Sequence, residues 1–266
     1  MKKKKSRIFW RINSLLALHF IWYYTLSHLK LKYRYTSLGV VWNFLEPALY
    51  LGILSLVFSV VNRMNIQDYV VFLFSALIPW RYLERAVNTA SESIVTGDWL
   101  LKKMYVSPFV FPVIRWLVAG VEYLFSLIIL IFFLLLFKEQ WTSHLWIVPL
   151  AFIPWAILSL GLGMIGAVLY TFFRDIRQII QLGLMIIFFT SPILFKPEIF
   201  QTASLQARIL QWNPVTYYAA LFQKPVYYLI WPAATDWIVT IGLSLIIFIL
   251  GASLVYRYRG RFYFYL

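Results

Sequence analysis

Long apolar runs separated by short charged breaks make up most of this chain. A membrane-spanning helix needs about 20 mostly apolar residues, and runs of this kind predict spans at roughly 40–61, 69–90, 109–137, 147–170, 178–195 and 236–256. Two further segments, 8–29 and 205–222, are apolar but short or interrupted by polar residues. The pattern predicts an all-α polytopic membrane protein with six transmembrane helices, forming a single transmembrane domain over residues 1–266.

Composition supports this class. The chain is 62% hydrophobic and 13% charged, with a mean hydropathy of +0.77, whereas soluble domains are nearer half apolar and a quarter charged. The absence of cysteine excludes disulfides, thiolate metal sites and cysteine nucleophiles. The histidines His19, His28 and His144 are too far apart in sequence to form a short metal-binding motif.

Lysine and arginine gather at the ends of the predicted spans, which orients the chain because basic residues favour the cytoplasmic side. Basic clusters flank residues 8–29 on both sides, so we predict an amphipathic interface helix over 6–36 rather than a span. Both termini are then cytoplasmic. We expect the segment 196–235 between the fifth and sixth spans to be external and its apolar part, 205–222, to be re-entrant or interfacial, because a seventh span would export the basic tail. The net charge of +14 therefore reflects membrane orientation, and no nucleic acid partner is expected.

Charged residues within the predicted spans are candidates for function, since ionisable groups are costly inside a membrane. The stretch PWRYLERAV places Arg81, Glu84 and Arg85 on one face of the second span, where the alternative is local neutralisation of Arg81 by Glu84. Glu122 lies near the middle of the third span and pairs either with Arg115, two turns away, or across helices. These groups are too sparse to favour a proton relay.

Aromatic residues form 20% of the chain. Interfacial belts and apolar packing are one explanation; a conduit for sugars, whose C–H groups suit aromatic faces, is the other. The predicted channel or gate residues combine aromatic and charged candidates: Trp42, Trp80, Arg81, Tyr82, Glu84, Arg85, Trp116 and Tyr123.

Motifs for catalysis are missing. GLGMIG at 161–166 matches a dinucleotide fingerprint, but it lies inside an apolar span, where small residues let helices approach closely. No glycine is followed by lysine, so the chain has no P-loop, and ATP-driven transport needs an ATPase on another chain. HExxH, GxSxG and close carboxylate pairs are absent too. We therefore expect a transport permease rather than an enzyme.

An ordered series of motifs runs along the chain: KYRYTSLGVVWNFLEPALY, LFSALIPW, GDWLLKKMYVSPFVFPVIR, FFRDIRQII, SPILF and WNPVTYY. Over nearly the whole chain this series resembles the ABC-2 type permeases that export polysaccharides, the membrane subunits of O-antigen, capsule and teichoic-acid transporters. LLKKMYVSPFVFP is most similar to the O-antigen branch.

The resemblance implies a multi-pass protein of the cytoplasmic (inner) membrane. It implies a homodimer that works with two copies of a separate ATPase subunit, which binds ATP and Mg, so this chain itself holds no cofactor. The pore lies between the two six-helix subunits, and the cargo is a polysaccharide on a polyprenyl-diphosphate carrier.

The resemblance also implies roles for individual residues. Two cytoplasmic loops contact the ATPase, and the coupling residues in them are Asp98, Lys102, Lys103, Phe173, Arg174, Asp175 and Arg177. Lys30, Lys32 and Arg34 of the interface helix meet lipid head groups, and Trp212, Asn213 and Pro214 belong to the external gate.

Two alternatives stay open at this point. One is a permease of the same fold that exports drugs, antibiotics or lipids. The other is a membrane-embedded glycolipid enzyme, which needs clustered carboxylates near a membrane face.

Overall fold

A computed structural model describes residues 14–34, 37–61, 65–97, 106–137, 143–199 and 205–265. Within these ranges the chain forms helices and turns without a β-strand. The predicted coupling residues Asp98, Lys102 and Lys103 lie outside the described residues. The all-helical class predicted from the apolar runs is confirmed.

The longer helices follow the predicted segments closely. They are α2 (Ser14–Tyr33), α3 (Trp42–Val61), α4 (Ile66–Thr96), α6 (Val110–Phe137), α7 (Val148–Phe172), α8 (Ile176–Phe189) and α11 (Ala234–Tyr258). The short helices are η1 (Gly39–Val41), η2 (Ser143–Ile147), η3 (Pro197–Ile199), α9 (Leu205–Trp212), α10 (Val215–Gln223), the π-helix η4 (Lys224–Tyr228) and α12 (Phe262–Tyr265).

Four helical segments in the described part of the chain are long and apolar enough to cross a membrane: Trp42–Val61, Val110–Leu136, Ser143–Phe172 and Ala234–Tyr258. The chain is therefore a multi-pass membrane protein. The other two predicted spans correspond to α4 and α8. α4 is long but carries charges along its length, and α8 has only 14 residues, fewer than the roughly 20 that cross a bilayer alone.

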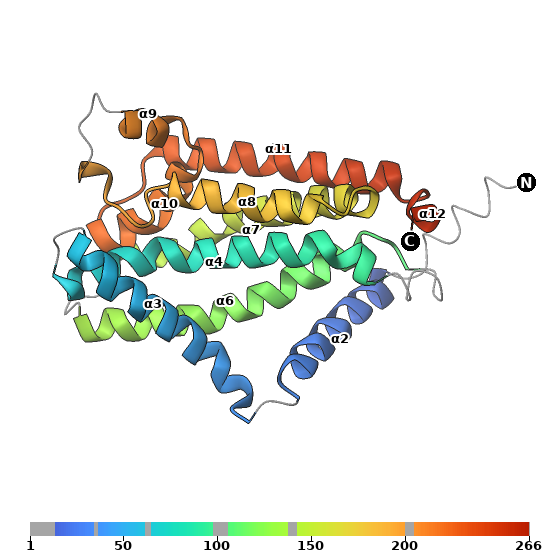
Figure 1. The fold of residues 1–266 in the computed structure, drawn as a ribbon, viewed down its shortest axis with the longest axis horizontal. Coiled ribbons are helices and arrows are strands. Elements are labelled where there is room, and N and C mark those ends of the chain that lie inside the picture. The colour runs from blue at the N-terminus through green and yellow to red at the C-terminus, as the bar shows by residue number, and fades with distance from the viewer. Residues whose placement is uncertain are drawn as a thin grey trace, which may run out of the picture.

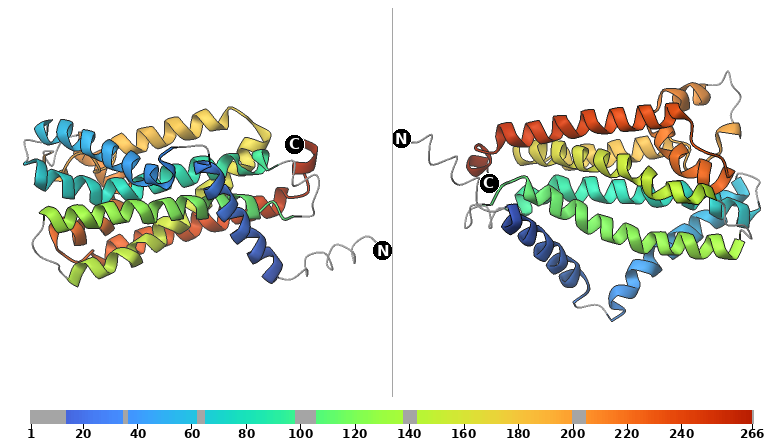
Figure 2. Two further views of the ribbon diagram at one scale, coloured as in Figure 1. Left: turned by 90° about the horizontal axis from the view of Figure 1, so that it is seen from below. Right: turned by 180° about the vertical axis from the view of Figure 1, so that it is seen from behind.

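The helix α4 forms the centre of the molecule. In Figure 1, α4, α6, α7, α8 and α11 run side by side along the long axis, while α2 and α3 diverge from them as a V. The right-hand view of Figure 2 shows the same V from behind. Every residue of α4 from Tyr69 to Trp80 is buried, and this stretch, though not the whole helix, is apolar on all sides. The charged residues Arg81, Glu84 and Arg85 follow directly after it and are partly exposed.

The two ends of the bundle differ. The start of α2, the turn between α7 and α8, and the C-terminal α12 lie together at one end, while α9 and α10 lie at the other (Figure 1). α9 and α10 fall within the predicted 196–235 segment. Their insertion as re-entrant helices stays a prediction.

Glycines of the GLGMIG stretch bring α7 against two neighbours. A Cβ on Gly161 would lie 2.7 Å from the backbone N and Cα of Phe248 on α11, and one on Gly163 would lie 2.6 Å from the Cβ of Ala90 on α4. Gly251 of α11 faces back, because its Cβ would lie 2.5 Å from the Gly161 carbonyl oxygen. The stretch lies inside α7. Its prediction as a packing motif, rather than a nucleotide loop, is confirmed.

Gly161→Ala is therefore expected to destabilise the chain by about 1–3 kcal/mol, the usual cost of overpacking, because the obstructing atoms are backbone and cannot turn aside. Gly242→Ala in α11 is the matched control, since a Cβ there has open space within 4 Å and alanine favours the helix by about 1 kcal/mol. Thermal unfolding of the detergent-solubilised chain measures both. Equal melting temperatures for the two variants would contradict the close approach of α7 and α11.

Candidate functional site

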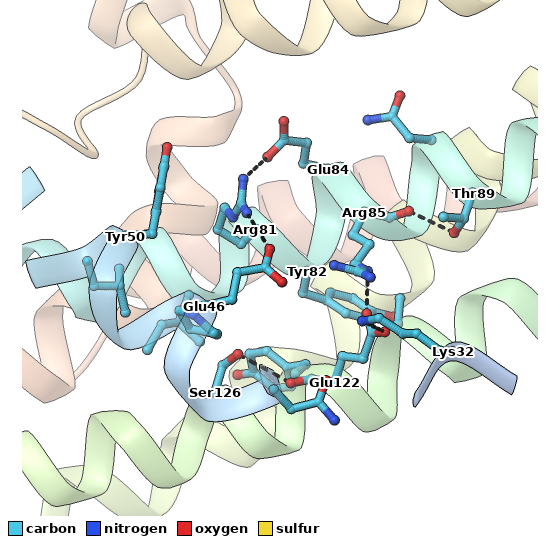
Figure 3. A pocket seen from close by; sticks show the side chains of 17 residues that line it. Lys32, Glu46, Tyr50, Arg81, Tyr82, Glu84, Arg85, Thr89, Glu122 and Ser126 are labelled. Atoms are coloured by element: carbon cyan, nitrogen blue, oxygen red, sulfur yellow. Dashed lines mark hydrogen bonds and ion pairs between the residues drawn. The ribbon is translucent and has the colours of Figure 1, made fainter. Parts of the chain in front are cut away.

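A cleft of about 300 Å³ opens between α2, α3, α4 and α6. Figure 3 shows its lining, which brings together side chains from sequence positions 32 to 126. Three basic and three acidic residues face it, so its formal charges balance: Lys32, Arg81, Arg85, Glu46, Glu84 and Glu122. Charged residues are rare on apolar helices that span a membrane, so this cluster of six makes the cleft the candidate functional site.

Glu122 is the most buried of these charges, with 8% of its surface exposed. Its Oε1 accepts a hydrogen bond of 2.7 Å from the Lys32 ammonium of α2, and the Arg85 guanidinium of α4 pairs with its Oε2. One carboxylate on α6 thereby joins three helices. Of the two pairings predicted for Glu122, the cross-helix one is correct, and Arg115 instead approaches the Nδ1 of His28 at 3.4 Å.

Arg81 occupies a more open part of the cleft. Its Nη1 lies 3.4 Å from Glu84 Oε2, its Nη2 lies 3.7 Å from Glu46 Oε1 on α3, and its guanidinium sits 4.6 Å from the centroid of the Tyr50 ring. The predicted neutralisation by Glu84 is confirmed, and Glu46 is an additional partner. These half-exposed pairs contribute about 0–1 kcal/mol each, so they can exchange partners with a bound solute at little cost.

Two tyrosines form an aromatic wall of the cleft. The Tyr82 hydroxyl accepts a hydrogen bond of 3.3 Å from Ser159, and the ring of Tyr123 stacks on Phe152 with centroids 4.2 Å apart. Both tyrosines line the cleft, as do Arg81, Glu84 and Arg85. The structure therefore brings together five of the predicted channel residues.

The three predicted tryptophans lie elsewhere. Trp80 is buried against Trp155 and Phe188. The Trp116 indole donates to the Ala156 carbonyl at 2.9 Å, across to α7. Trp42 begins α3 and is 40% exposed. For these residues the alternative of packing and surface placement fits the structure better than cleft lining.

Several cleft residues were absent from the predicted channel set. Lys32 was assigned to lipid head groups, and it pairs with Glu122 in the cleft, while Lys30 and Arg34 are exposed near the end of α2. Glu122 was noticed as a charge within a span, and Glu46 in the first predicted span carries the same signal. Asn43, Asn88 and Thr89 carry no comparable signal.

The turn between α7 and α8 consists of Phe173, Arg174 and Asp175, all exposed, with Phe173 at 66%. Asp175 is the N-cap of α8, where its charge is favoured by the helix dipole although its side chain makes no capping hydrogen bond. Arg177 Nε lies 2.8 Å from Glu92 Oε1 on α4. Arg177, at the start of α8, thus ties the segment after the turn to α4, which carries three of the six charges of the cleft.

At the other end of the bundle, Asn213 joins α8 to the α9–α10 connection. Its amide nitrogen donates to the Thr190 carbonyl at 3.0 Å and to Ser191 Oγ at 2.9 Å, and its Oδ1 accepts from the Val215 N–H at 2.9 Å. Trp212 is 87% exposed and Pro214 is the N-cap of α10. Of the predicted external gate residues, Asn213 has the clearest structural role, as a connector.

A polar network also holds the segment that follows α8. The Tyr227 hydroxyl donates to Asp68 Oδ2 at 2.7 Å and contacts the Lys196 ammonium, while Lys224 and Asp236 form an ion pair of 2.5 Å. Burial, and then the Asp68 carboxylate, raise the pKa of the Tyr227 phenol above its usual value, so it remains a donor at neutral pH. These contacts attach the α10–α11 region to the start of α4.

Comparison with known proteins places these features in a family. The profile of ABC-2 type transporters matches residues 19–227, which include the cleft and the α7–α8 turn.

Individual relatives agree with the profile. The chain is 29% identical over 175 residues to the O-antigen export system permease protein RfbA of Klebsiella pneumoniae, covering 65% of this chain and 68% of the relative. It is 28% identical over 200 residues to the protein of the same name from Myxococcus xanthus, covering 74% and 77%. The polysialic acid transport protein KpsM of Escherichia coli is 25% identical over 208 residues, covering 76% and 78%. From the extent of the profile match, this chain belongs to the ABC-2 type transporter family.

Proposed function

We propose that this chain is the transmembrane subunit of an ATP-driven exporter. The exporter moves a lipid-linked polysaccharide of the O-antigen class across the cytoplasmic membrane. The observation that carries the proposal is the charge-balanced, tyrosine-walled cleft in a chain of this family. The names of its relatives, two O-antigen export permeases and a polysialic acid transport protein, support a glycan as the cargo.

The chemistry of the cleft suits a sugar. Each hydroxyl of a glycan donates and accepts a hydrogen bond, and the cleft offers carboxylates to accept and guanidinium groups to donate. The ring of Tyr50, which is 37% exposed, offers an apolar face for sugar C–H groups, whereas Tyr82 and Tyr123 line the cleft with little exposed surface. Because the charges of the cleft balance, a neutral glycan can enter and leave it without being held by one tight electrostatic contact.

The proposed topology has six spans. α4 and α8 are the second and fifth, α2 is the cytoplasmic interface helix, and both termini are cytoplasmic. α4 is about 46 Å long at 1.5 Å per residue, longer than the roughly 30 Å hydrocarbon core. Its charged C-terminal part therefore extends toward the cytoplasmic head groups. α9 and α10 then form an external gate.

The proposed assembly is a homodimer with two ATPase subunits. α3 and α8 support it because each keeps an apolar face exposed: Ile53, Leu56, Val57 and Val60 on α3, and Ile179, Leu182, Met185 and Ile186 on α8. In a membrane such faces meet lipid or a second copy of the chain. The cargo pathway lies between the two copies, and the exposed α7–α8 turn receives the ATPase.

Co-purification from native membranes tests the function. The expected result is capture of an ABC ATPase together with a polyprenyl-diphosphate-linked glycan, identified by mass spectrometry. Capture of the ATPase with a small drug-like molecule in place of the glycan would favour the second kind of exporter instead.

The purified chain alone is expected to hydrolyse no ATP, and the complex with its ATPase is expected to do so. The reason is the missing P-loop: no glycine in the sequence is followed by lysine. Phosphate release from the chain in proteoliposomes, with and without the partner, is the measurement. An ATPase partner whose own P-loop lysine is replaced serves as the control. Robust hydrolysis by the chain alone would contradict the assignment of ATP hydrolysis to the partner.

A further inference from the structure

A second cavity, of about 120 Å³, lies between α2 and the adjoining ends of α4 and α6. It shares no lining residue with the charged cleft. α2 contributes Tyr24 and His28 to its wall, α4 contributes Ser93 and Thr96, and α6 contributes Arg115. The proposed export function makes no use of this cavity.

Arg115 distinguishes the cavity from the cleft. Each basic residue of the cleft has a carboxylate within 4 Å, but in the described part of the chain Arg115 forms no ion pair. Its hydrogen-bonding partner is His28 Nδ1, at 3.4 Å. Glu92 of α4 attracts Arg115 electrostatically, but its carboxylate is already paired with Arg177 at 2.8 Å. A half-buried guanidinium without a counter-ion is costly, so the cavity favours an anion.

His28 supplies a second donor. An arginine can only donate, so Nδ1 of His28 accepts from Arg115, and the ring proton of a neutral imidazole lies on Nε2. Burial, and then Arg115, lower the pKa of His28 below its usual value, so the ring is neutral at pH 7 while the cavity is empty. Arrival of an anion offsets the charge of Arg115 and favours a second proton on the ring. That proton occupies Nδ1, so the Arg115 N–H that faced Nδ1 turns to the anion.

Tyr24 supplies a third donor. Its ring meets the His28 ring edge to face, with centroids 4.7 Å apart, and within the described ranges its hydroxyl makes no hydrogen bond. The hydroxyls of Ser93 and Thr96 already donate to backbone carbonyls of α4. A guanidinium, an imidazole N–H and a phenol without a competing carboxylate suit the oxygens of a phosphate.

The position of the cavity indicates the source of that phosphate. The apolar segment Val110–Leu136 begins beside it, and Arg115 lies about 7.5 Å along α6 from that start at 1.5 Å per residue. The whole segment is about 40 Å long at the same rise, longer than the roughly 30 Å hydrocarbon core. About 5 Å at each end therefore extends into the head-group layer, and Arg115 lies close to the boundary of that layer.

We propose that this cavity binds the phosphate of an anionic phospholipid, with Arg115 supplying the charge and His28 and Tyr24 donating hydrogen bonds. The bound lipid bridges α2 and the ends of α4 and α6. The site requires only that α6 spans the membrane, so it does not depend on the identity of the cargo.

Lipid titration of the full chain in dodecyl maltoside tests the proposal, with thermal unfolding followed by tryptophan fluorescence. Dioleoyl phosphatidylglycerol is expected to raise the melting temperature in a saturable way, as any ligand of the folded state does. Dioleoyl phosphatidylcholine has the same tails but no net charge and is expected to raise it far less. Inorganic phosphate is the third titrant; saturable stabilisation by phosphate as strong as that by phosphatidylglycerol would overturn the assignment to a lipid.

Variants locate the site. Arg115→Gln is expected to weaken the phosphatidylglycerol effect at least tenfold, whereas Arg257→Gln, an exposed arginine near the end of α11, loses the same charge and is expected to bind as the parent chain does. Arg115→Lys keeps the charge without the fork of donors and is expected to fall between them, which covers the case in which glutamine impairs folding. Equal weakening by Arg115→Gln and Arg257→Gln would overturn the proposal.

The pH dependence of lipid binding tests whether His28 binds the phosphate or has only a structural role. Binding that adds a proton to His28 is stronger at pH 5.5 than at pH 8, and His28→Gln is expected to abolish this difference. The other groups that face the site are Arg115, Tyr24 and the paired Glu92; burial raises the pKa of Tyr24 above its usual value, so it does not titrate in this range. An unchanged pH dependence in His28→Gln would remove His28 from the site.

Discussion

Glu122→Gln is expected to destabilise the chain by about 3 kcal/mol, at the lower end of the cost of breaking a buried ion pair. The carboxylate is 8% exposed and pairs with both Lys32 and Arg85. A neutral amide removes the carboxylate that pairs with both cations, Lys32 and Arg85. The lower end applies because about a third of each cationic side chain is exposed, so water relieves part of the cost. Thermal or denaturant unfolding in detergent measures the loss.

Glu84→Gln is the matched control. The chemical change is the same and the residue faces the same cleft, but Glu84 and its partner Arg81 are both more than a third exposed, so about 0–1 kcal/mol is expected. Adding Arg85→Gln to Glu122→Gln removes one of the two cations that paired with the carboxylate, and it is expected to recover part of the lost free energy of unfolding. If Glu84→Gln costs as much as Glu122→Gln, the buried carboxylate does not join the three helices as described.

The second large effect is expected at the α7–α8 turn. Replacing Arg174 and Asp175 together with alanine is expected to reduce export more than tenfold while membrane insertion stays normal. Both side chains are exposed, so little packing is lost, and the pair of changes leaves the net charge unaltered. A charged, exposed turn is a suitable contact for an ATPase subunit, because the adjacent Arg177 pairs with Glu92 of α4.

Surface polysaccharide and the amount of inserted protein are the two measurements for this variant. Arg257→Ala, an exposed change near the end of α11, is the control and is expected to export normally. ATP hydrolysis by the complex is expected to persist in the double variant, since the lost contact transmits motion rather than forming the ATPase site. Normal export by the double variant would refute the coupling role of the turn.

The helical class was predictable from the apolar runs, and two of the long helices match their predicted segments within two residues at each end. The expected span at 109–137 matches α6 at Val110–Phe137, and that at 147–170 matches α7 at Val148–Phe172. The burial of α4 was harder to anticipate, because Asp68, Arg81, Glu84, Arg85 and Glu92 make it less apolar than its neighbours, yet it is the most enclosed helix around Tyr69–Trp80.

The candidate site was predictable only in part. Charge within an apolar run identified Arg81, Glu84 and Arg85, since the cost of burying a charge is visible in a single segment. Aromatic residues have no such signal: Tyr82 and Trp80 are two residues apart on α4, yet Tyr82 lines the cleft and Trp80 packs against Trp155 and Phe188. An aromatic ring is stable in lipid, in a core or in a channel, so its type alone does not select among them.

The sequence by itself determined the helical class, the approximate ends of the long helices and the lack of a P-loop, because hydrophobic run length and motif spacing are local properties. Only the tertiary structure decided which charges meet. Lys32 and Glu122 are 90 residues apart in sequence but form a hydrogen bond of 2.7 Å, and Arg115 has a histidine rather than a carboxylate beside it. The free energy of such a pair depends on distance and burial between helices, which packing sets.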